Sequence, residues 1–217
     1  MALFKTLDST RSALEAANTA VAEWEAKHAN ATAELAQLES TAMDEILEDP
    51  AKAETHAFKV GTLTAQISVY ARAIEAARTK ALDRHRDLLE AEAKDEDKKA
   101  AEAEKVVAKH AAKVKTAMDA LQELEGVEFA VKVSLDWKGQ PDSIQSKSKT
   151  QLLQGVAEDH MFRAYVIREF LESGKIHDNA WSMGGLPGYG TKFIASKHVP
   201  ASVRAAKTAG LNRELTE

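Results

Sequence analysis

Helix-breaking residues are almost absent from the first 125 positions of the chain. Nine of the ten glycines and three of the four prolines follow Glu125, which leaves only Pro50 and Gly61 before it. About a quarter of this region is alanine, the residue with the highest helix propensity. The sequence therefore predicts a mainly α-helical domain over residues 1–125 and a separate module over residues 126–217.

Heptad spacing predicts how the first helix packs. Leu7, Leu14, Val21, His28 and Leu35 repeat every seven residues, and a companion row includes Trp24 and Leu38. We expect Asp8 or Ser9 to cap this helix and Glu48, Asp49 and Pro50 to end it.

A second row of apolar residues at heptad spacing, or seam, follows the turn at Pro50, and its length matches that of the first helix. It contains Val60, Ile67, Ile74, Ala81 and Leu88, with Leu63, Tyr70 and Ala77 beside them. Because only a few residues connect the two helices, the sequence predicts an antiparallel helical hairpin from about residue 8 to residue 92.

The polar segment 90–99, EAEAKDEDKK, interrupts the second seam. It has no large apolar residue and places Glu90 near Lys94 and Asp95 near Lys99, so we expect an exposed helix that is solvated on every face. The apolar row resumes at Val107, but the nineteen residues after Leu88 are not a multiple of seven. Either the helix continues and meets a new partner, or it turns near 95–97; the lack of Gly, Pro and Asn favours continuity.

Alanine-rich seams bury little apolar area, so long helices of this kind usually need another copy or a partner to cover the remaining stripe. We therefore expect a coiled-coil rod that forms homo-oligomers. The predicted oligomer seam comprises Leu7, Leu14, Val21, Trp24, Leu35, Leu38, Val60, Ile67, Ile74, Leu88, Val107, Val114 and Leu121.

The pattern changes after Gly126, where eight of the twelve aromatic residues lie. The alternation from Val127 to Leu135 is typical of a half-buried strand, and residues 151–173 fit an amphipathic helix ended by Gly174. A short extended segment at 193–195 and a helix at about 200–209 complete a small α+β docking module. We expect the compact core to lie in this module, because aromatic side chains bury the largest areas.

A loop rich in glycine and aromatic residues, 181–193, is the best candidate for binding. Its backbone amides could cradle phosphate, but its spacing departs from both the phosphate-binding loop and the RNA-recognition strand signature. We interpret it as a docking loop that anchors to the core or to a neighbouring subunit. Its candidate residues are Trp181, Leu186, Tyr189, Lys192 and Phe193.

No motif in the sequence specifies a reaction. The chain has no cysteine, and Glu25 with His28 is one histidine–carboxylate pair where a di-iron bundle needs two. Three C-terminal histidines, His160, His177 and His198, with Asp159 and Asp178 beside them, allow a hydrolase as an alternative. We expect no enzyme, no cofactor and no metal site.

Charge and hydropathy further limit the classes of protein to which the chain can belong. The formal charge is −7 over residues 1–125 and +2 over 126–217, which is not the strongly basic balance of a dedicated duplex binder. No run of 18 apolar residues or signal-like start occurs, so we expect a soluble protein that is cytoplasmic when made.

The sequence thus favours a non-catalytic structural or assembly protein that binds itself and another protein, as virion components and assembly scaffolds do. Two alternatives remain: a nucleic-acid-binding protein that uses the loop 181–193, and a helical stalk that carries a C-terminal hydrolase or toxin.

Overall fold

The chain is mainly helical, as its composition predicts. The computed structural model describes residues 6–126, 149–176, 181–183, 192–194 and 198–215; for 181–183, 192–194 and 215 the backbone alone is described. In chain order the described elements are α1 (Leu7–Glu48), α2 (Lys52–Glu125), α3 (Lys149–Ser173), β1 (Trp181–Met183), β2 (Lys192–Ile194), α4 (Ala201–Thr208) and the short 3-10 helix η2 (Arg213–Leu215). The predicted strand from Val127 to Leu135 lies outside the described residues.

Helix α1 begins two or three residues earlier than the sequence indicates. Thr6, rather than Asp8 or Ser9, is the capping residue, and its hydroxyl oxygen accepts a hydrogen bond of 3.3 Å from the amide of Ser9. A threonine in extended conformation can make this bond, because its short side chain reaches the free amides of the first turn. Asp8 instead lies in the first helical turn, where its negative charge complements the helix dipole.

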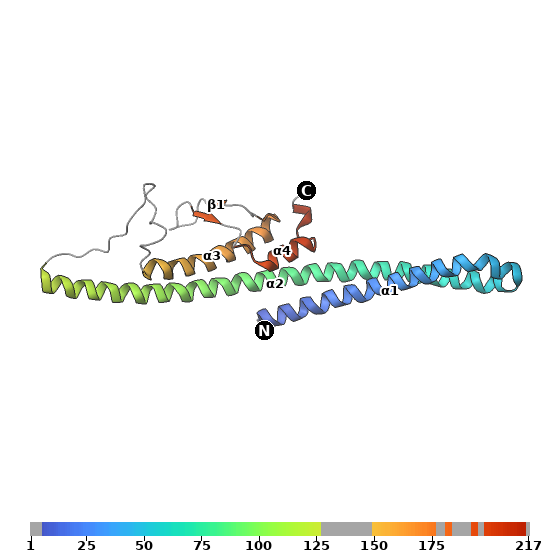
Figure 1. The fold of residues 1–217 in the computed structure, drawn as a ribbon, viewed down its shortest axis with the longest axis horizontal. Coiled ribbons are helices and arrows are strands. Elements are labelled where there is room, and N and C mark those ends of the chain that lie inside the picture. The colour runs from blue at the N-terminus through green and yellow to red at the C-terminus, as the bar shows by residue number, and fades with distance from the viewer. Residues whose placement is uncertain (1–5, 127–148, 177–180, 184–191, 195–197, 216–217) are drawn as a thin grey trace. The chain divides into compact units, whose positions relative to one another are not determined.

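The predicted turn between the first two helices is confirmed. Asp49 leaves the helical conformation, and its carboxylate accepts a hydrogen bond of 3.1 Å from the amide of Ala51. Asparagine and aspartate favour such turns because their side chains replace a backbone acceptor. Helix α1 and the first part of α2 then run antiparallel (Figure 1).

The chain divides into two compact units. One contains Met1–Leu88 with Ala209–Leu211, and the other contains Leu89–Thr208 with Asn212–Glu217. We call them the hairpin unit and the C-terminal unit. The division falls inside α2, whereas the sequence places a boundary at Gly126, which is the residue where α2 ends with a positive φ of 67°.

Helix α2 is continuous through residues 95–97, so the alternative turn at this position is wrong. The segment 90–99 is helical, but it is not solvated on every face. Ala93 is 3% exposed and Glu96 is 9% exposed. The small side chain of Ala93 allows close approach, and Glu96 meets basic and imidazole groups on α3, so this face is buried within the C-terminal unit.

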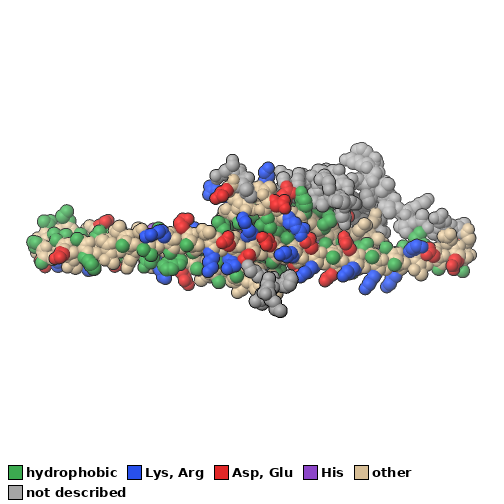
Figure 2. Space-filling view, turned by 180° about the vertical axis from the view of Figure 1, so that it is seen from behind, with side chains coloured by type: hydrophobic (Ala, Val, Ile, Leu, Met, Phe, Trp, Pro, Cys, Tyr) green, Lys and Arg blue, Asp and Glu red, His purple; other side chains and the backbone are tan. Residues whose placement is uncertain are grey.

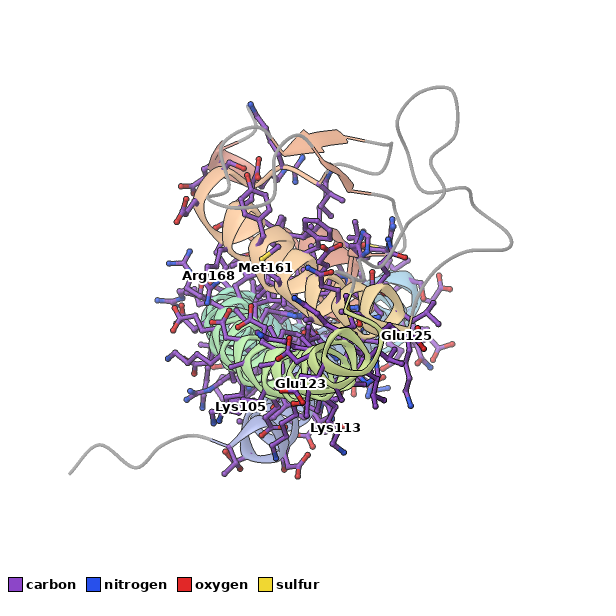
Figure 3. All side chains as sticks on the ribbon, turned by 90° about the vertical axis from the view of Figure 1, so that its left-hand side faces the viewer. Lys105, Lys113, Glu123, Glu125, Met161 and Arg168 are labelled. Atoms are coloured by element: carbon purple, nitrogen blue, oxygen red, sulfur yellow. The ribbon has the colours of Figure 1, made fainter. Side chains whose placement is uncertain are left out.

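The C-terminal unit packs α3 and α4 on the second part of α2, and α3 runs antiparallel to it (Figures 1 and 3). Its largest fully buried side chains are Leu89, Ile167, Phe170 and Val203. Lys105 lies on the side of α2 that faces away from α3 (Figure 3). The prediction of a C-terminal core therefore holds for the described residues, although α2 supplies one wall of it.

Both C-terminal helices end near the predicted positions. Gly174 has a positive φ of 68° and donates its amide to the carbonyl of Phe170 at 2.9 Å, which closes α3. The side-chain amide of Asn212 also donates to this carbonyl, at 2.8 Å. These bonds satisfy acceptors that the end of α3 leaves without helical partners.

Two short strands bracket the candidate docking loop. β1 and β2 pair antiparallel, with Trp181 opposite Ile194 and Met183 opposite Lys192. The extended segment predicted at 193–195 is thus close to β2, whereas β1 was expected to be loop. Trp181, Lys192 and Phe193 lie in these strands; Leu186 and Tyr189 lie outside the described residues.

Candidate functional site

The hairpin unit brings the two predicted rows of apolar residues together. Ile74 and Leu88 are buried, and Leu63, Ala17 and Ala31 are buried with them. The other seam residues of this unit are half-buried: Leu7, Leu14, Val21, Trp24, Leu35, Leu38, Val60 and Ile67. Packing within one chain therefore covers this seam in part.

Aromatic and charged contacts fix the register of the hairpin. The rings of Trp24 and Tyr70 lie 5.9 Å apart, and the ammonium group of Lys27 lies 4.2 Å from the Trp24 ring. The guanidinium of Arg78 donates to the carboxylate of Glu25 at 2.8 Å. Since this ion pair is exposed, it contributes at most about 1 kcal/mol, so the register depends chiefly on the packed rings and aliphatic side chains.

Alanines leave an open groove between α1 and α2. The groove has a volume of about 530 Å³ and is lined chiefly by alanines from both helices, with Trp24, Lys80 and Arg84 completing it. Methyl groups fill less space than the leucines of a tightly packed coiled coil, so the two helices alone do not close this face.

A second apolar face lies on α2 in the same unit. Phe58 is 75% exposed and Val69 is 52% exposed, and a hollow of about 670 Å³ lies between them over Gly61 and Ala65. Hydrophobic side chains also lie exposed among charged ones in the space-filling view (Figure 2). Phe58, Gly61, Ala65 and Val69 follow helical spacing, so the sequence contains a signal for this face. The heptad pattern on the same helix instead led to the prediction of Val60 and Ile67 as seam residues.

The seam residues of the C-terminal unit are covered unevenly. Val107 and Val114 are half-buried, whereas Leu121 is 46% exposed and Leu124 is 81% exposed. On α3, Leu152 and Val156 are also at least half exposed. Coverage of the apolar row on α2 therefore decreases from Val107 toward Glu125.

Two histidine–carboxylate pairs connect the elements of the C-terminal unit. Nδ1 of His160 lies 2.6 Å from a carboxylate oxygen of Glu96, and Nε2 of His198 lies 2.8 Å from a carboxylate oxygen of Asp159. Lys99 and Arg163 also approach Glu96, at 3.2 Å and 4.0 Å. The first pair joins α3 to α2. The second joins α3 to His198, three residues before α4, so both pairs have a role in packing.

Further polar contacts reinforce the same interface. Arg168 on α3 donates to Asp97, and Ser202 on α4 donates to Glu92. The acidic residues of segment 90–99 thus meet donors on both C-terminal helices. These partners were not predicted from the sequence, because nothing in the spacing of apolar residues along α2 shows which later segment covers it.

Two of the histidines proposed for a hydrolase have different carboxylate partners. His160 and His198 each pair with a different carboxylate, and the ring of His198 packs 5.2 Å from that of Phe162. His177 and Asp178 lie outside the described residues. Among the described residues, no group of three or more histidine or acidic side chains could hold a metal ion.

The pKa values of the buried His85 and of the half-buried Tyr165 differ from their ordinary values. Burial lowers the pKa of His85, because desolvation disfavours the charged imidazolium. Burial also raises the pKa of Tyr165 to about 12, with a contribution from its hydrogen bond to Glu169. Neither shift assembles an acid–base pair with a substrate cavity, so both are consistent with structural roles.

Comparison with protein-family models, curated proteins and solved structures gives no match for this chain. Within the described residues, no helix combines the length and the apolar character needed to cross a bilayer.

Proposed function

We propose that the protein is a non-catalytic assembly protein, made in the cytoplasm, that self-associates through coiled-coil packing of its helical hairpin. A virion component or an assembly scaffold is the kind of protein that fits this proposal. The C-terminal module, with the strand pair around its loop, docks a neighbouring copy or another protein.

The observation that carries this proposal is the second apolar face of α2. One side of this helix packs against α1, yet Phe58 and Val69 remain 75% and 52% exposed on another side. Large apolar side chains grouped around a hollow mark interaction surfaces more often than isolated exposed ones do. The alanine-lined groove beside α1 adds further apolar surface to the same unit.

The native mass of the full chain, measured with an image of any assembly, tests this proposal. We expect a homo-oligomer with a defined copy number, visible as a closed particle or a filament. A chain that stays monomeric at high micromolar concentration and forms no assembly would contradict it.

The two histidine–carboxylate pairs favour one other function, the C-terminal hydrolase. Carboxylates that orient histidines occur in general acid–base sites. If this alternative holds, expression of the full chain should arrest growth, and His160→Ala or His198→Ala should relieve the arrest without unfolding the chain. If both variants leave growth unchanged relative to the parent chain, the pairs have only the packing role.

A further inference from the structure

The apolar face around Phe58 lies on a different side of α2 from the buried row that packs on α1, although the Phe58 side chain also borders a groove with Leu38 and Thr41 of α1. At 3.6 residues per turn, Ala65 and Val69 are on average about 150° from Leu63 and Ile74 around the helix axis. Leu63 and Ile74 are buried, while Phe58 and Val69 are exposed. Nothing in the described part of the chain lies within 4 Å of a Cβ built on Gly61, so the hollow at this point is open.

This face is complementary to itself when a second copy runs antiparallel. A two-fold axis that crosses α2 between Leu63 and Thr64 places Phe58 of one copy beside Val69 of the other. The phenyl ring then reaches the edge of the partner's hollow, where Gly61 and Ala65 leave room for it. The same contact occurs twice, once on each side of the axis.

Charges at the two ends of the face distinguish the orientations. Glu54 and Arg72 lie on this side of α2, 18 residues and about 27 Å apart. In the antiparallel arrangement, Glu54 of each copy lies near Arg72 of the other. A parallel arrangement in register would instead oppose glutamate to glutamate and arginine to arginine, which is unfavourable.

Both charged side chains are available for such pairing. Glu54 and Arg72 are exposed, and within the described residues neither forms an ion pair. Arg72 makes one hydrogen bond, of 3.5 Å, from its Nε to the carbonyl of Ser68 on the preceding turn. Its guanidinium can therefore turn toward an acidic group without breaking an ion pair in its own chain.

We propose that a second copy of this chain covers the Phe58 face of α2, antiparallel, with two Glu54–Arg72 ion pairs flanking the apolar contact. This inference rests on the proposed self-association and adds the face, the partner and the orientation.

Charge reversal tests the pairing. Glu54→Arg and Arg72→Glu should each weaken dimerisation about tenfold, because each change replaces two attractive contacts by two repulsive ones. The double variant Glu54→Arg/Arg72→Glu restores opposite charges and should recover most of the affinity. Glu39→Arg on α1 and Lys59→Glu beside the face are matched controls, and both should dimerise like the parent chain.

The apolar contact has a separate test. Phe58→Ala should weaken dimerisation at least tenfold, while helical content by circular dichroism stays unchanged because the ring is already exposed in one chain. Leu47→Ala is a matched control, since Leu47 is 76% exposed at the end of α1 and lies off this face.

Spin labels can measure the orientation directly, because the chain has no native cysteine to remove. In the antiparallel dimer, labels on Thr62→Cys should lie within about 15 Å of each other, and labels on Ala76→Cys about 37 Å apart along the axis. Two short distances would show a parallel dimer and overturn the inference.

Different results would overturn the antiparallel contact and the self-association. A dimer that is unaffected by Phe58→Ala and by both charge reversals would overturn the inference while self-association stands. A parent chain that is monomeric at every concentration would overturn both.

Discussion

At the scale of single residues, one of the buried histidines of the hairpin unit, His85, makes stability depend on pH. His85 is 7% exposed, and burial lowers its pKa from the ordinary value of 6.5. The unfolded chain therefore binds a proton more readily, so the stabilisation is full above pH 6.5 and is lost as the pH falls through the lower, folded-state pKa.

We expect His85→Leu to reduce the loss of unfolding free energy between about pH 7 and about pH 5. Denaturant titration of both proteins at the two pH values measures this difference. Equal losses in the parent chain and the variant would show that His85 does not contribute to the pH dependence.

The pair between Glu96 and His160 should contribute to the packing of α3 on α2. Each single change, Glu96→Gln or His160→Gln, should lower the unfolding free energy by about 1–3 kcal/mol, because a largely buried group loses its partner. In the double variant, the loss of unfolding free energy should be smaller than the sum of the two single losses by at least about 0.5 kcal/mol, since the residues are in contact. Strict additivity in denaturant titrations would mean that the pair has no coupling energy.

At the scale of elements, two glycines should respond in opposite ways to the same substitution. Gly155 lies inside α3 and Gly126 ends α2 with a φ of 67°, and an added Cβ meets no atom within 4 Å at either position. Gly155→Ala should raise the unfolding free energy by about 0.5–1 kcal/mol, because alanine is the better helix former.

Gly126→Ala should instead lower the unfolding free energy by about 1 kcal/mol, because an L residue is strained at positive φ. Thermal unfolding followed by circular dichroism compares the two variants directly. Effects of the same sign would show that helix propensity and backbone strain do not govern these positions.

Helix boundaries were the part of the fold that the sequence predicted best. The break at Pro50, the continuity of α2 and the end of α3 at Gly174 all follow from local backbone preferences, which the residues themselves carry. The capping residue Thr6 was missed by two or three positions, an ordinary error because several short polar side chains lie near the helix start.

Partners of helix faces were harder to predict. The phase change after Leu88 indicated a new partner for the last part of α2, and α3 and α4 of the same chain supply it near Ala93 and Glu96. Periodicity shows that a face is apolar, but long-range contacts such as Glu96 with His160, 64 residues apart, leave no local signal. The interpretation of segment 90–99 as fully solvated was wrong for this reason.

At the scale of the whole molecule, the account depends on the apolar surface that one chain leaves exposed. The predicted oligomer seam is partly covered by the hairpin itself, whereas the Phe58 face is not. The predicted seam and the Phe58 face both include residues of α2, and the exposed face became visible only when the packing of α1 on this helix was known. This face is where we place the contact with another copy.

The most direct test of this claim is the thermal unfolding midpoint of the full chain as a function of concentration. If another copy covers the Phe58 face, the midpoint should rise steadily over a thousandfold increase in concentration, because association stabilises only the folded chain. Phe58→Ala should flatten this dependence. A midpoint of the parent chain that does not change over the same range would contradict the account.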